Sequence, residues 1–559
     1  MKGKMFLKGI ALLVSAGMVA GALSGCGSSQ DESSNDVSGT TQGSSSESSI
    51  GSSTESQEKE AGYTDYSNGF SERVTIQIPV YDRAFEGWNP TDNYYTRWIQ
   101  EEFGEKFNVN VQYVAIGRNT EVQDYMQLIA AGNAPDVIMN YDMPQMVNYY
   151  SEGAMQTIDL DEVAFYAPNY YEALGETINT YGQLDGDTVF FFAERNAIYY
   201  DAIEVVRLDW LEEVGLKLPT NLEERETMGK AWKDAGLGTI GDKLWVQSFT
   251  YQYPFITDED EMDLAMYLDL SIASFTWEPT KEYLRTYNRM YNDGIYDSEF
   301  YLNKEDQDAK ADFVSGKTGT YEFRISSNTD VISSLLANNP DAKLAVLDPT
   351  SKSPDGTAKY YEYPPYGMIM GVDSTTSDEE RAALWMFFEW MKQAENLFFL
   401  QNGIEGETYT LDADGVAIAI SDYAGEAKLS NNMNKDYWCL VQEVKDYGDE
   451  DKNKKANFSS LAPEGYEYLV EQSYDYCLKN ADQGIITPIF TKSVSSSSEY
   501  SADLKAMWQE FYVDCITCAP EEFDDKYEEY CQEYLDGGYQ DILDEKMSYI
   551  DSGDYIDAN

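Results

Sequence analysis

The stretch of residues 73–139 alternates between strand-like and helix-like patterns, and this alternation restricts the fold more than any other part of the sequence. Apolar and polar residues alternate in 73–80 (RVTIQIPV), a helical pattern follows in 93–103, and a second strand-like run occupies 109–114. A further helical pattern covers 120–131 and ends at Gly132, before a buried strand predicted over 134–139. Strand, helix, strand, helix and strand with short links predict an α/β fold with a parallel sheet.

Several polar residues stand at the ends of predicted strands, where parallel α/β sheets bind their ligands. Tyr141 and Asp142 follow the third strand, Arg195 follows the apolar run at 189–193, and Arg324 closes the strand-like run GTYEFR. These four residues are therefore candidates for a binding site. An alternative for both arginines is a structural ion pair with one of the many carboxylates.

The N-terminus has the proportions of a bacterial secretion signal. Lys2, Lys4 and Lys8 precede an apolar stretch at 10–22, which is too short to span a bilayer as a helix. The stretch ends in Leu-Ser-Gly-Cys and resembles a lipobox, which implies that residues 1–25 are removed and that Cys26 carries lipid. An ordinary secretory signal that contains a cysteine is the alternative. Residues 26–62 are almost entirely polar and small, and predict a disordered tether.

Length and charge narrow the classes of function. Beyond the tether about 500 residues remain, too many for one compact core, so two or more lobes are expected. The chain carries 39 Lys+Arg against 100 Asp+Glu, and a field of that sign repels nucleic acid and anionic membrane surfaces. It disfavours a polyanionic ligand as well, although a local basic cleft could override the average. Histidine is absent, which excludes His-dependent catalysis and His-containing metal sites, while hydrolysis by paired carboxylates stays possible.

Five cysteines follow Cys26, and the odd number leaves at least one thiol outside any internal disulfide. They are Cys439, Cys477, Cys515, Cys518 and Cys531. The Cys515-x-x-Cys518 spacing has no second CxxC to accompany it and lies in an amphipathic stretch. Structural thiols are the favoured interpretation, one disulfide is the alternative, and neither a metal nor another cofactor is expected.

Five segments together resemble the family 1 extracellular solute-binding proteins, the lipoprotein receptors of ABC-type carbohydrate importers, and in particular the large oligosaccharide branch of Gram-positive bacteria. Single segments are weak signals, but their order along the chain is specific. The segments are 131–139 (AGNAPDVIM), 207–224 (RLDWLEEVGLKLPTNLEE), 291–300 with 313–319 (YNDGIYDSEF and FVSGKTG), 401–410 (QNGIEGETYT, with Thr408 where a basic residue is usual) and 486–543, which opens ITPIFTK.

The resemblance implies a two-lobed α/β clamp similar to periplasmic binding proteins, each lobe a mainly parallel sheet flanked by helices, with hinge segments crossing between the lobes. We expect residues 63–190 with about 310–370 in lobe 1, and about 191–309 with about 371–559 in lobe 2. Some relatives carry a calcium loop where this chain reads 227–245, which lacks alternating acidic ligands. Asp412 and Asp414 are a fragment of such a pattern, so no calcium site is expected.

A sugar site needs aromatic platforms and planar polar groups, and 45 Tyr, 10 Trp and 23 Phe supply the rings in excess. Most of these rings must pack in cores. Position adds Trp88, in the loop after the first strand, Trp245, in the expected second lobe, and Tyr366, before an expected hinge strand, to Tyr141, Asp142, Arg195 and Arg324 as ligand-binding candidates.

The leading hypothesis is a monomeric, lipid-anchored receptor on the outer face of the membrane. It would capture an oligosaccharide, expected to be neutral, and deliver it to the permease subunits of an ABC importer, with no catalytic residue of its own. A surface glycosidase that uses two carboxylates and a receptor for a peptide or another solute are the alternatives.

Overall fold

The structure of the protein, a computed structural model, describes residues 62–556 except 84–86, 119, 196–201, 240–251, 257–271, 303–305, 325–329, 421–422, 429–434, 458–462 and 464. The signal segment, Cys26, the tether and Trp245 lie outside the described residues. Residues 61–559 form one compact unit. No helix of the described part is long and apolar enough to cross a membrane.

The predicted alternation of strands and helices is confirmed. Strand β1 (Val74–Asp82) pairs in parallel with β2 (Val109–Gly117) along its whole length, from Val74 opposite Val109 to Asp82 opposite Gly117. Between them lie α1 (Tyr94–Ile99), a π-helical turn (Gln100–Gly104) and α2 (Glu105–Phe107), and α3 (Glu121–Ala131) follows β2. Gly132 ends α3 with a left-handed φ of 65°, which a glycine adopts without steric cost. The chain then enters β3 (Val137–Asn140).

Asp136 fastens β3 beside β1. Its backbone N–H donates to the carbonyl of Gln77 at 2.9 Å, and its carboxylate accepts the N–H of Gln77 at 2.6 Å. The second carboxylate oxygen accepts the Thr376 hydroxyl at 2.9 Å. Burial raises the pKa of Asp136, and these hydrogen bonds oppose that rise. These bonds fix the start of β3, the strand after which two candidate residues follow.

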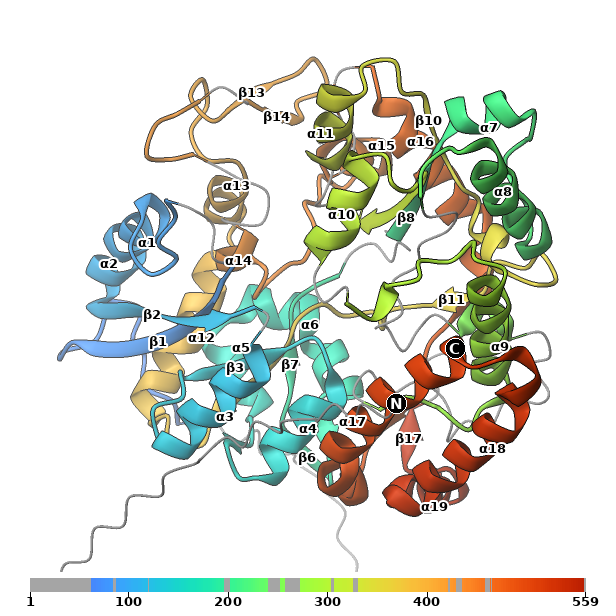
Figure 1. Ribbon diagram of the computed structural model, residues 1–559. Helices are drawn as coiled ribbons and strands as arrows, with labels where there is room; N and C mark the ends of the chain where they lie inside the picture. The colour runs from blue at the N-terminus through green and yellow to red at the C-terminus, as the bar shows by residue number, and fades with distance from the viewer. Residues whose placement is uncertain are drawn as a thin grey trace, which may run out of the picture. The chain divides into compact units, whose positions relative to one another are not determined.

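Strand β12 (Ile369–Asp373), from a distant part of the chain, is the centre of a four-stranded sheet that lies beside the β1–β2 ladder, and the two are together called the first sheet here. It pairs antiparallel with β3, β4 (Met155–Gln156) and β7 (Phe191–Phe192). The apolar helix α12 (Asp378–Lys392) packs against the sheet and begins at a capping box formed by Ser377 and Glu380. Helices α4 (Met143–Ser151), α5 (Leu160–Tyr166), α6 (Pro168–Tyr181), α13 (Ala394–Asn402) and α14 (Lys435–Trp438) surround it (Figure 1).

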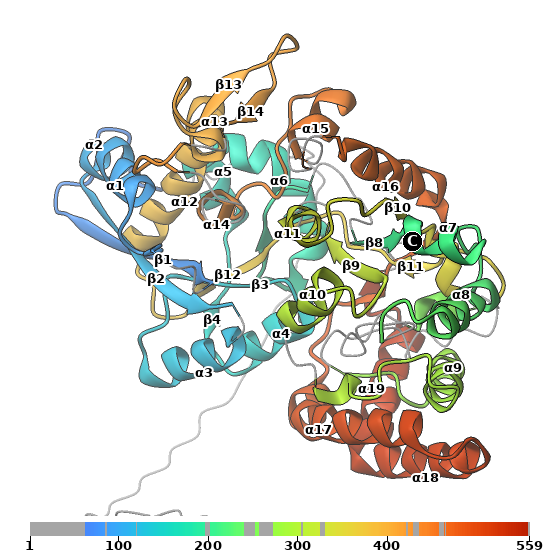
Figure 2. The ribbon, with the colours of Figure 1, turned by 45° about the horizontal axis from the view of Figure 1, so that its top comes forward.

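A second sheet has β8 (Ala202–Arg207) at its centre, antiparallel to both β9 (Thr320–Arg324) and β10 (Leu344–Val346). Helices α7 (Leu208–Val214), α8 (Leu222–Ala235), α10 (Asp306–Val314), α11 (Asp330–Asn338) and α16 (Glu467–Lys479) lie around it (Figure 2). Arg225 of α8 is fully buried and holds both oxygens of Glu204 on β8, at 2.7 and 2.6 Å. This ion pair fastens α8 to the sheet.

The C-terminal part of the chain forms a helical layer. Helices α17 (Ser495–Thr517), α18 (Phe523–Tyr534) and α19 (Gln540–Ser552) share one apolar cluster with α9 (Glu278–Asn292), and both ribbon views place them together (Figures 1 and 2). Cys515 and Cys518 are buried in this cluster, and none of the five described cysteines takes part in a disulfide. This agrees with structural thiols.

Short elements complete the described chain. The two-stranded hairpins are β5 (Gln183–Leu184) with β6 (Asp187–Thr188), and β13 (Tyr409–Leu411) with β14 (Ala417–Ala419). Helix α15 (Glu450–Asn457) precedes α16, and β16 (Ile489–Phe490) pairs with β17 (Tyr555–Ile556). Strand β11 (Tyr360–Tyr361) lies in the stretch that leads from β10 of the second sheet to β12 of the first, and it runs parallel to β15 (Gly484–Ile485); the two are called the crossing segments below.

The packing of segments differs from the expected division. The apolar cluster that contains β1 and β3 takes up residues from 372–441, which were expected in lobe 2. Residues 313–346, which were expected in lobe 1, pack with β8. The reason is strand pairing, because β12 joins β3 and β9 joins β8. The pairs β12–β3 and β9–β8 both run antiparallel. The parallel pairing predicted from the alternation of strands and helices is found between β1 and β2.

Candidate functional site

A cavity opens where the first sheet, the crossing segments and the C-terminal helices meet, and its empty space, open solvent included, is about 990 Å³. Its walls come from the turn between β3 and α4, from Arg195 beyond β7, from residues 361–369 around β11 and β12, and from residues 487–497 with one residue of α19. Because three parts of the chain contribute walls, a ligand held there would contact all three of them at once.

The first wall is the β3–α4 turn. β3 ends at Asn140, whose side-chain oxygen accepts the N–H of Asp142 at 2.9 Å and so fixes the turn. Tyr141 and Asp142 both line the cavity, followed by Val147 and Asn148 on α4. Tyr141 and Asp142 are the two residues predicted as ligand candidates from their place after the third strand.

Arg195 is held in place by several contacts. Its guanidinium donates to one carboxylate oxygen of Glu443, at 3.1 and 2.9 Å, and to the carbonyl of Pro364 at 3.2 Å. The guanidinium carbon lies 5.0 Å from the centroid of the Tyr363 ring. Arg195 thus forms the structural ion pair that was the alternative to a binding role. The same side chain also lines the cavity.

Glu443 is charged in spite of its burial. Burial acts to raise the pKa of this carboxyl, but Arg195 and Lys435 outweigh it and hold the pKa below its ordinary value. For the neighbouring Tyr141, burial is the main cause of a pKa well above the ordinary range, and the Glu443 charge adds to it. Tyr141 is thus a neutral hydroxyl at physiological pH. Arg118 lies over its ring, with 5.7 Å between the guanidinium carbon and the ring centroid.

Tyrosines of the crossing segment form the next wall. Tyr361 and Tyr363 line the cavity with their rings 5.4 Å apart, nearly perpendicular to each other. Tyr366 also lines it, but its ring is buried and stacks on Phe192 with 4.2 Å between the ring centroids. Burial raises the pKa of Tyr366 far above its ordinary value. Tyr366 therefore closes the floor of the cavity, while Tyr361 and Tyr363 are better placed as platforms.

The last wall was missed by the sequence analysis. Thr487, Phe490, Lys492 and Ser497 come from the segment around β16 and the first turn of α17, and Lys546 comes from α19. The segment ITPIFTK at 486–492 carries part of the family resemblance, but its sequence pattern does not indicate a wall of the site. Its strand is two residues long, too short for a periodic signal.

Side chains of this wall also touch the first wall directly. The Ser498 hydroxyl bonds Asn148 Oδ1 at 2.5 Å, and the Ser493 hydroxyl donates to Asp185 at 3.0 Å. The Asp185 N–H donates to the carbonyl of Thr491 at 2.9 Å. These contacts join α4 and the β5–β6 hairpin to the start of α17 and close one side of the cavity.

The remaining candidates do not line this cavity. Trp88 is partly buried against the first apolar cluster. Arg324 ends β9, where it stands opposite Ala202, and its side chain lies outside the described part of the structure, as does all of Trp245. Four of the seven candidates, Tyr141, Asp142, Arg195 and Tyr366, are thus brought together.

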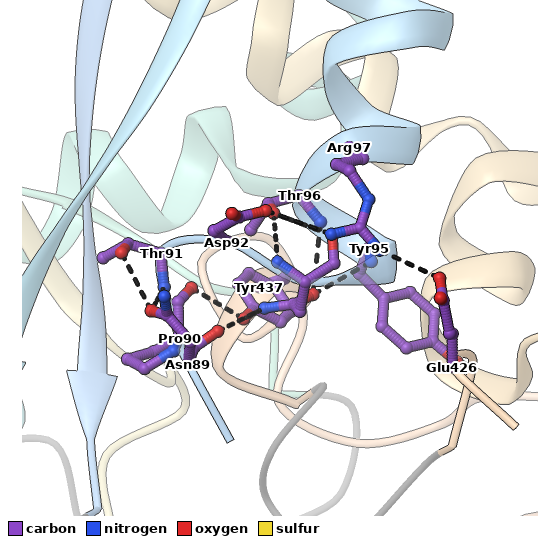
Figure 3. Close-up of polar contacts among 10 residues, drawn as sticks. Asn89, Pro90, Thr91, Asp92, Tyr95, Thr96, Arg97, Glu426 and Tyr437 are labelled. Carbon is purple, nitrogen blue, oxygen red and sulfur yellow. Dashed lines mark hydrogen bonds and ion pairs between the residues drawn. The ribbon is translucent and has the colours of Figure 1, made fainter. Parts of the chain in front are cut away.

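The loop that carries Trp88 is fastened by polar contacts (Figure 3). The Tyr437 hydroxyl donates to the carbonyl of Pro90 at 2.8 Å and accepts the side-chain N–H of Asn93 at 2.5 Å. Asn93 in turn caps α1, and Arg97 on that helix pairs with Asp92 at 3.0 Å and Glu426 at 3.1 Å (Figure 3). The loop is therefore held to α14 at the rim of the first sheet.

The described residues contain no cluster of three or more side chains suited to a metal ion. At the Asp412 and Asp414 turn, the ammonium of Lys455 pairs with both carboxylates. The cation bound by these two carboxylates is therefore a lysine of the protein.

The sequence profile of the bacterial extracellular solute-binding proteins matches residues 98–398, more than half of the chain. The chain belongs to this family. The match spans β2, β3, β8 and β12, and so includes β12 and β8, the central strands of the four-stranded and three-stranded sheets.

A curated relative, the polygalacturonan/rhamnogalacturonan-binding protein YtcQ of Bacillus subtilis, is 24% identical over 301 residues. The alignment covers 51% of this chain and 58% of the relative, less than two thirds of its length. Among solved structures, the alginate-binding protein AlgQ2 without calcium ion superposes with a TM-score of 0.60 at 17% identity, over 85% of this chain and 97% of the other. The substrate-binding protein FusA of S. pneumoniae in complex with kestose has a TM-score of 0.59 at 14% identity, over 86% and 99%. The two-lobed α/β class is confirmed by these superpositions.

Proposed function

We propose that this protein captures an oligosaccharide in the cavity and delivers it to the permease subunits of an ABC-type importer. A lipid on Cys26 would hold it at the outer face of the membrane, where residues 26–62 would let a monomeric body move between solute and permease. The observation that carries the proposal is the composition of the cavity, since one hollow gathers aromatic platforms and planar polar groups from three parts of the chain.

The aromatic platforms are Tyr361, Tyr363 and Phe490, which offer flat faces to the C–H surfaces of sugar rings. Asp142, Asn148 and Arg195 supply acceptors and donors for hydroxyl groups. The names of the three relatives also refer to carbohydrates, namely polygalacturonan/rhamnogalacturonan, alginate and kestose.

Surface hydrolysis is the competing function. Glycosidases commonly need two carboxyl groups about 5–10 Å apart across the scissile bond. Of the described residues that line the cavity, Asp142 is the single carboxylate. The composition of the site therefore favours capture without cleavage, and membership of a solute-binding family agrees with this proposal.

The test is a thermal-shift and calorimetric screen of the mature protein with panels of neutral oligosaccharides, acidic oligosaccharides and peptides. We expect an oligosaccharide to raise the melting temperature and to be recovered intact. Tyr363→Ala is expected to weaken its binding about 10-fold, since one stacking ring is lost. Tyr171→Ala removes a tyrosine on α6 that does not line the cavity, and serves as the matched control.

Two outcomes would contradict the proposal. Shortened sugars in the recovered ligand would mean that the protein is an enzyme, and stabilisation by peptides alone would refute the carbohydrate assignment. The anchor is tested separately by Cys26→Ala, which is expected to abolish palmitate labelling and to release the protein into the medium.

A further inference from the structure

Glu443 stands behind three walls of the cavity and is not itself part of the lining. One wall carries Tyr141, the next carries Arg195, and the third carries Gly367 between β11 and β12. The side chain of Glu443 meets all three of these residues and is 13% exposed. A single carboxylate with a contact to each wall is placed to set their relative positions.

The first contact is with Arg195. One oxygen of Glu443 accepts two N–H groups of the guanidinium, at 3.1 and 2.9 Å. The third guanidinium nitrogen donates to the Pro364 carbonyl at 3.2 Å, and the guanidinium carbon lies 5.0 Å from the centroid of the Tyr363 ring. A free arginine side chain has many rotamers, so the charge of Glu443 selects the one that lies over Tyr363.

The second contact is with Tyr141. Burial raises the pKa of Glu443, and Arg195, Lys435 and the hydrogen bond of the Tyr141 hydroxyl together bring it below its ordinary value. Glu443 is therefore a charged acceptor at physiological pH. A charged acceptor holds a hydroxyl more strongly than a neutral one, so the same charge that orders Arg195 also orders the ring of Tyr141.

The third contact depends on a glycine. A Cβ added to Gly367 would lie 2.4 Å from Cγ of Glu443 and 3.2 Å from Cβ of Ala193. Since Gly367 lines the cavity, the side chain of Glu443 passes directly beneath the wall at this point. A larger residue would displace either the wall or the carboxylate.

The backbone fixes the segment that carries Glu443. Its N–H donates to the carbonyl of Glu194 at 2.8 Å, and the N–H of Glu194 donates to the carbonyl of Val441 at 3.1 Å. The N–H of Gly367 donates to the carbonyl of Ala193 at 2.8 Å. The three segments are thus hydrogen-bonded side by side, and the contacts of the carboxylate are built on a fixed backbone.

We propose that Glu443 is a positioning residue of the ligand site, whose charge holds Arg195 and Tyr141 in the orientation in which they meet the bound oligosaccharide. The inference rests on the proposed function and deepens it, because a residue outside the cavity sets the affinity inside it. Arg195 and Tyr141 are ordered before the ligand arrives, so binding does not include the entropic cost of ordering them.

The test measures the affinity and the stability of the mature protein separately, by calorimetry and by thermal unfolding. The probes are tetramers of glucose, mannose, xylose, galactose and galacturonate, together with kestose, and the tightest binder is used with every variant. Glu443→Gln keeps the shape of the side chain and removes its charge. We expect it to weaken binding about 10-fold, because the ligand then has to order two side chains.

A second background shows whether Glu443 acts through Arg195. In Arg195→Met the main partner is already absent, so adding Glu443→Gln should weaken binding by at most about 3-fold further. The double variant should also unfold at a higher temperature than Arg195→Met, because the unpaired carboxylate has been removed. A residue that only supported the fold would show neither effect.

Two further variants complete the comparison. Gly367→Ala displaces the carboxylate and leaves its charge, and should weaken the same probe by a similar factor even if Glu443→Gln fails to fold. Glu204→Gln is the matched control, since Glu204 is also a buried carboxylate, held by Arg225 at 2.7 and 2.6 Å, and does not line this cavity. It should lower the melting temperature and leave the affinity unchanged.

The two proposals fail in different ways. An affinity of Glu443→Gln within about 2-fold of the wild type, or an equally large loss in the Arg195→Met background, overturns the positioning role and leaves oligosaccharide capture standing. Absence of binding of every probe to the wild type overturns capture, and the positioning role falls with it.

Discussion

The ion pair of Arg195 and Glu443 offers the sharpest test of how the cavity is built. Arg195→Met keeps most of the volume of the side chain and removes its charge and its donors. Glu443 then loses two hydrogen bonds, at 3.1 and 2.9 Å, and the Pro364 carbonyl loses one at 3.2 Å. The cation over Tyr363 is lost as well.

The cost follows from the exposure of the pair. The side chains of Arg195 and Glu443 are 10% and 13% exposed, so water replaces the lost partner poorly. Breaking a buried pair from one side costs about 3–5 kcal/mol, because an unpaired charge stays behind. Lys435 supplies a second positive charge near Glu443, which reduces the cost. We expect the free energy of unfolding to fall by about 2–3 kcal/mol at pH 7.

The pH dependence has a definite sign. In the wild type the pKa of Glu443 is held below its ordinary value of 4.5, so its stabilising contribution is complete above that value and is lost as pH falls through the folded pKa. In Arg195→Met, the arginine no longer lowers the pKa of Glu443, so burial raises that pKa. The variant's deficit is therefore largest at neutral pH and shrinks toward pH 4, where the carboxyl takes up a proton.

Urea unfolding followed by tryptophan fluorescence at pH 7.5 and pH 4.5 measures both effects. The matched control is Arg73→Met, which breaks an exposed pair with Glu105 and should change little at either pH. A loss for Arg195→Met as small as that of the control, or equal losses at the two pH values, would refute the argument that the cavity wall depends on a desolvated charge pair.

Three further predictions concern other parts of the molecule. Gly319→Ala is expected to cost about 1–3 kcal/mol in urea unfolding, because an added Cβ would lie 2.7 Å from the Trp232 ring; an unchanged midpoint would mean that the ring moves aside. Glu545→Ala should cost about 1 kcal/mol above pH 5 and less as pH falls, since hydrogen bonds to the α17 cap outweigh burial and hold the pKa of this carboxyl below 4.5; equal costs at pH 7 and pH 3.5 would contradict this. Burial lowers the pKa of Lys445 to about 8, so the buried charge destabilises the folded protein below that pH. Lys445→Met should therefore stabilise the protein below pH 8 by about 2 kcal/mol, after allowance for the lost hydrogen bond to Asn402. This gain in the free energy of unfolding should disappear as pH rises above 10.5.

The sequence predicts the part of the site that obeys local rules. Tyr141 and Asp142 were predicted as ligand candidates because they follow a strand expected to be parallel, and Arg195 because it follows an apolar run; all three line the cavity. In both cases the candidate residues lie within a few positions of an apolar strand-like run that can be recognised in the sequence. Tyr366 was found from its prolines, although its ring serves the floor more than the surface of the cavity.

The rest of the site depends on contacts between distant segments. Lys492 and Lys546 lie 54 positions apart in the sequence, and both line the cavity because β16 pairs with β17 and because Glu545 caps α17. Strands of two residues carry no period that a sequence pattern could reveal. The division into lobes failed for the same reason, since the pairing of β12 with β3 leaves no mark in either segment.

The central place of β12 also has a consequence for how the protein is made. A chain emerges N-terminus first, so β3 and β4 exist for roughly 230 residues of synthesis before the strand between them arrives, and the first sheet has a high contact order. Until β12 and α12 have been synthesised, the apolar faces of β3 and β4 stay uncovered, and the first sheet cannot be completed. The sheet can therefore form only after about two thirds of the chain has been synthesised, which places its folding late in the production of the protein.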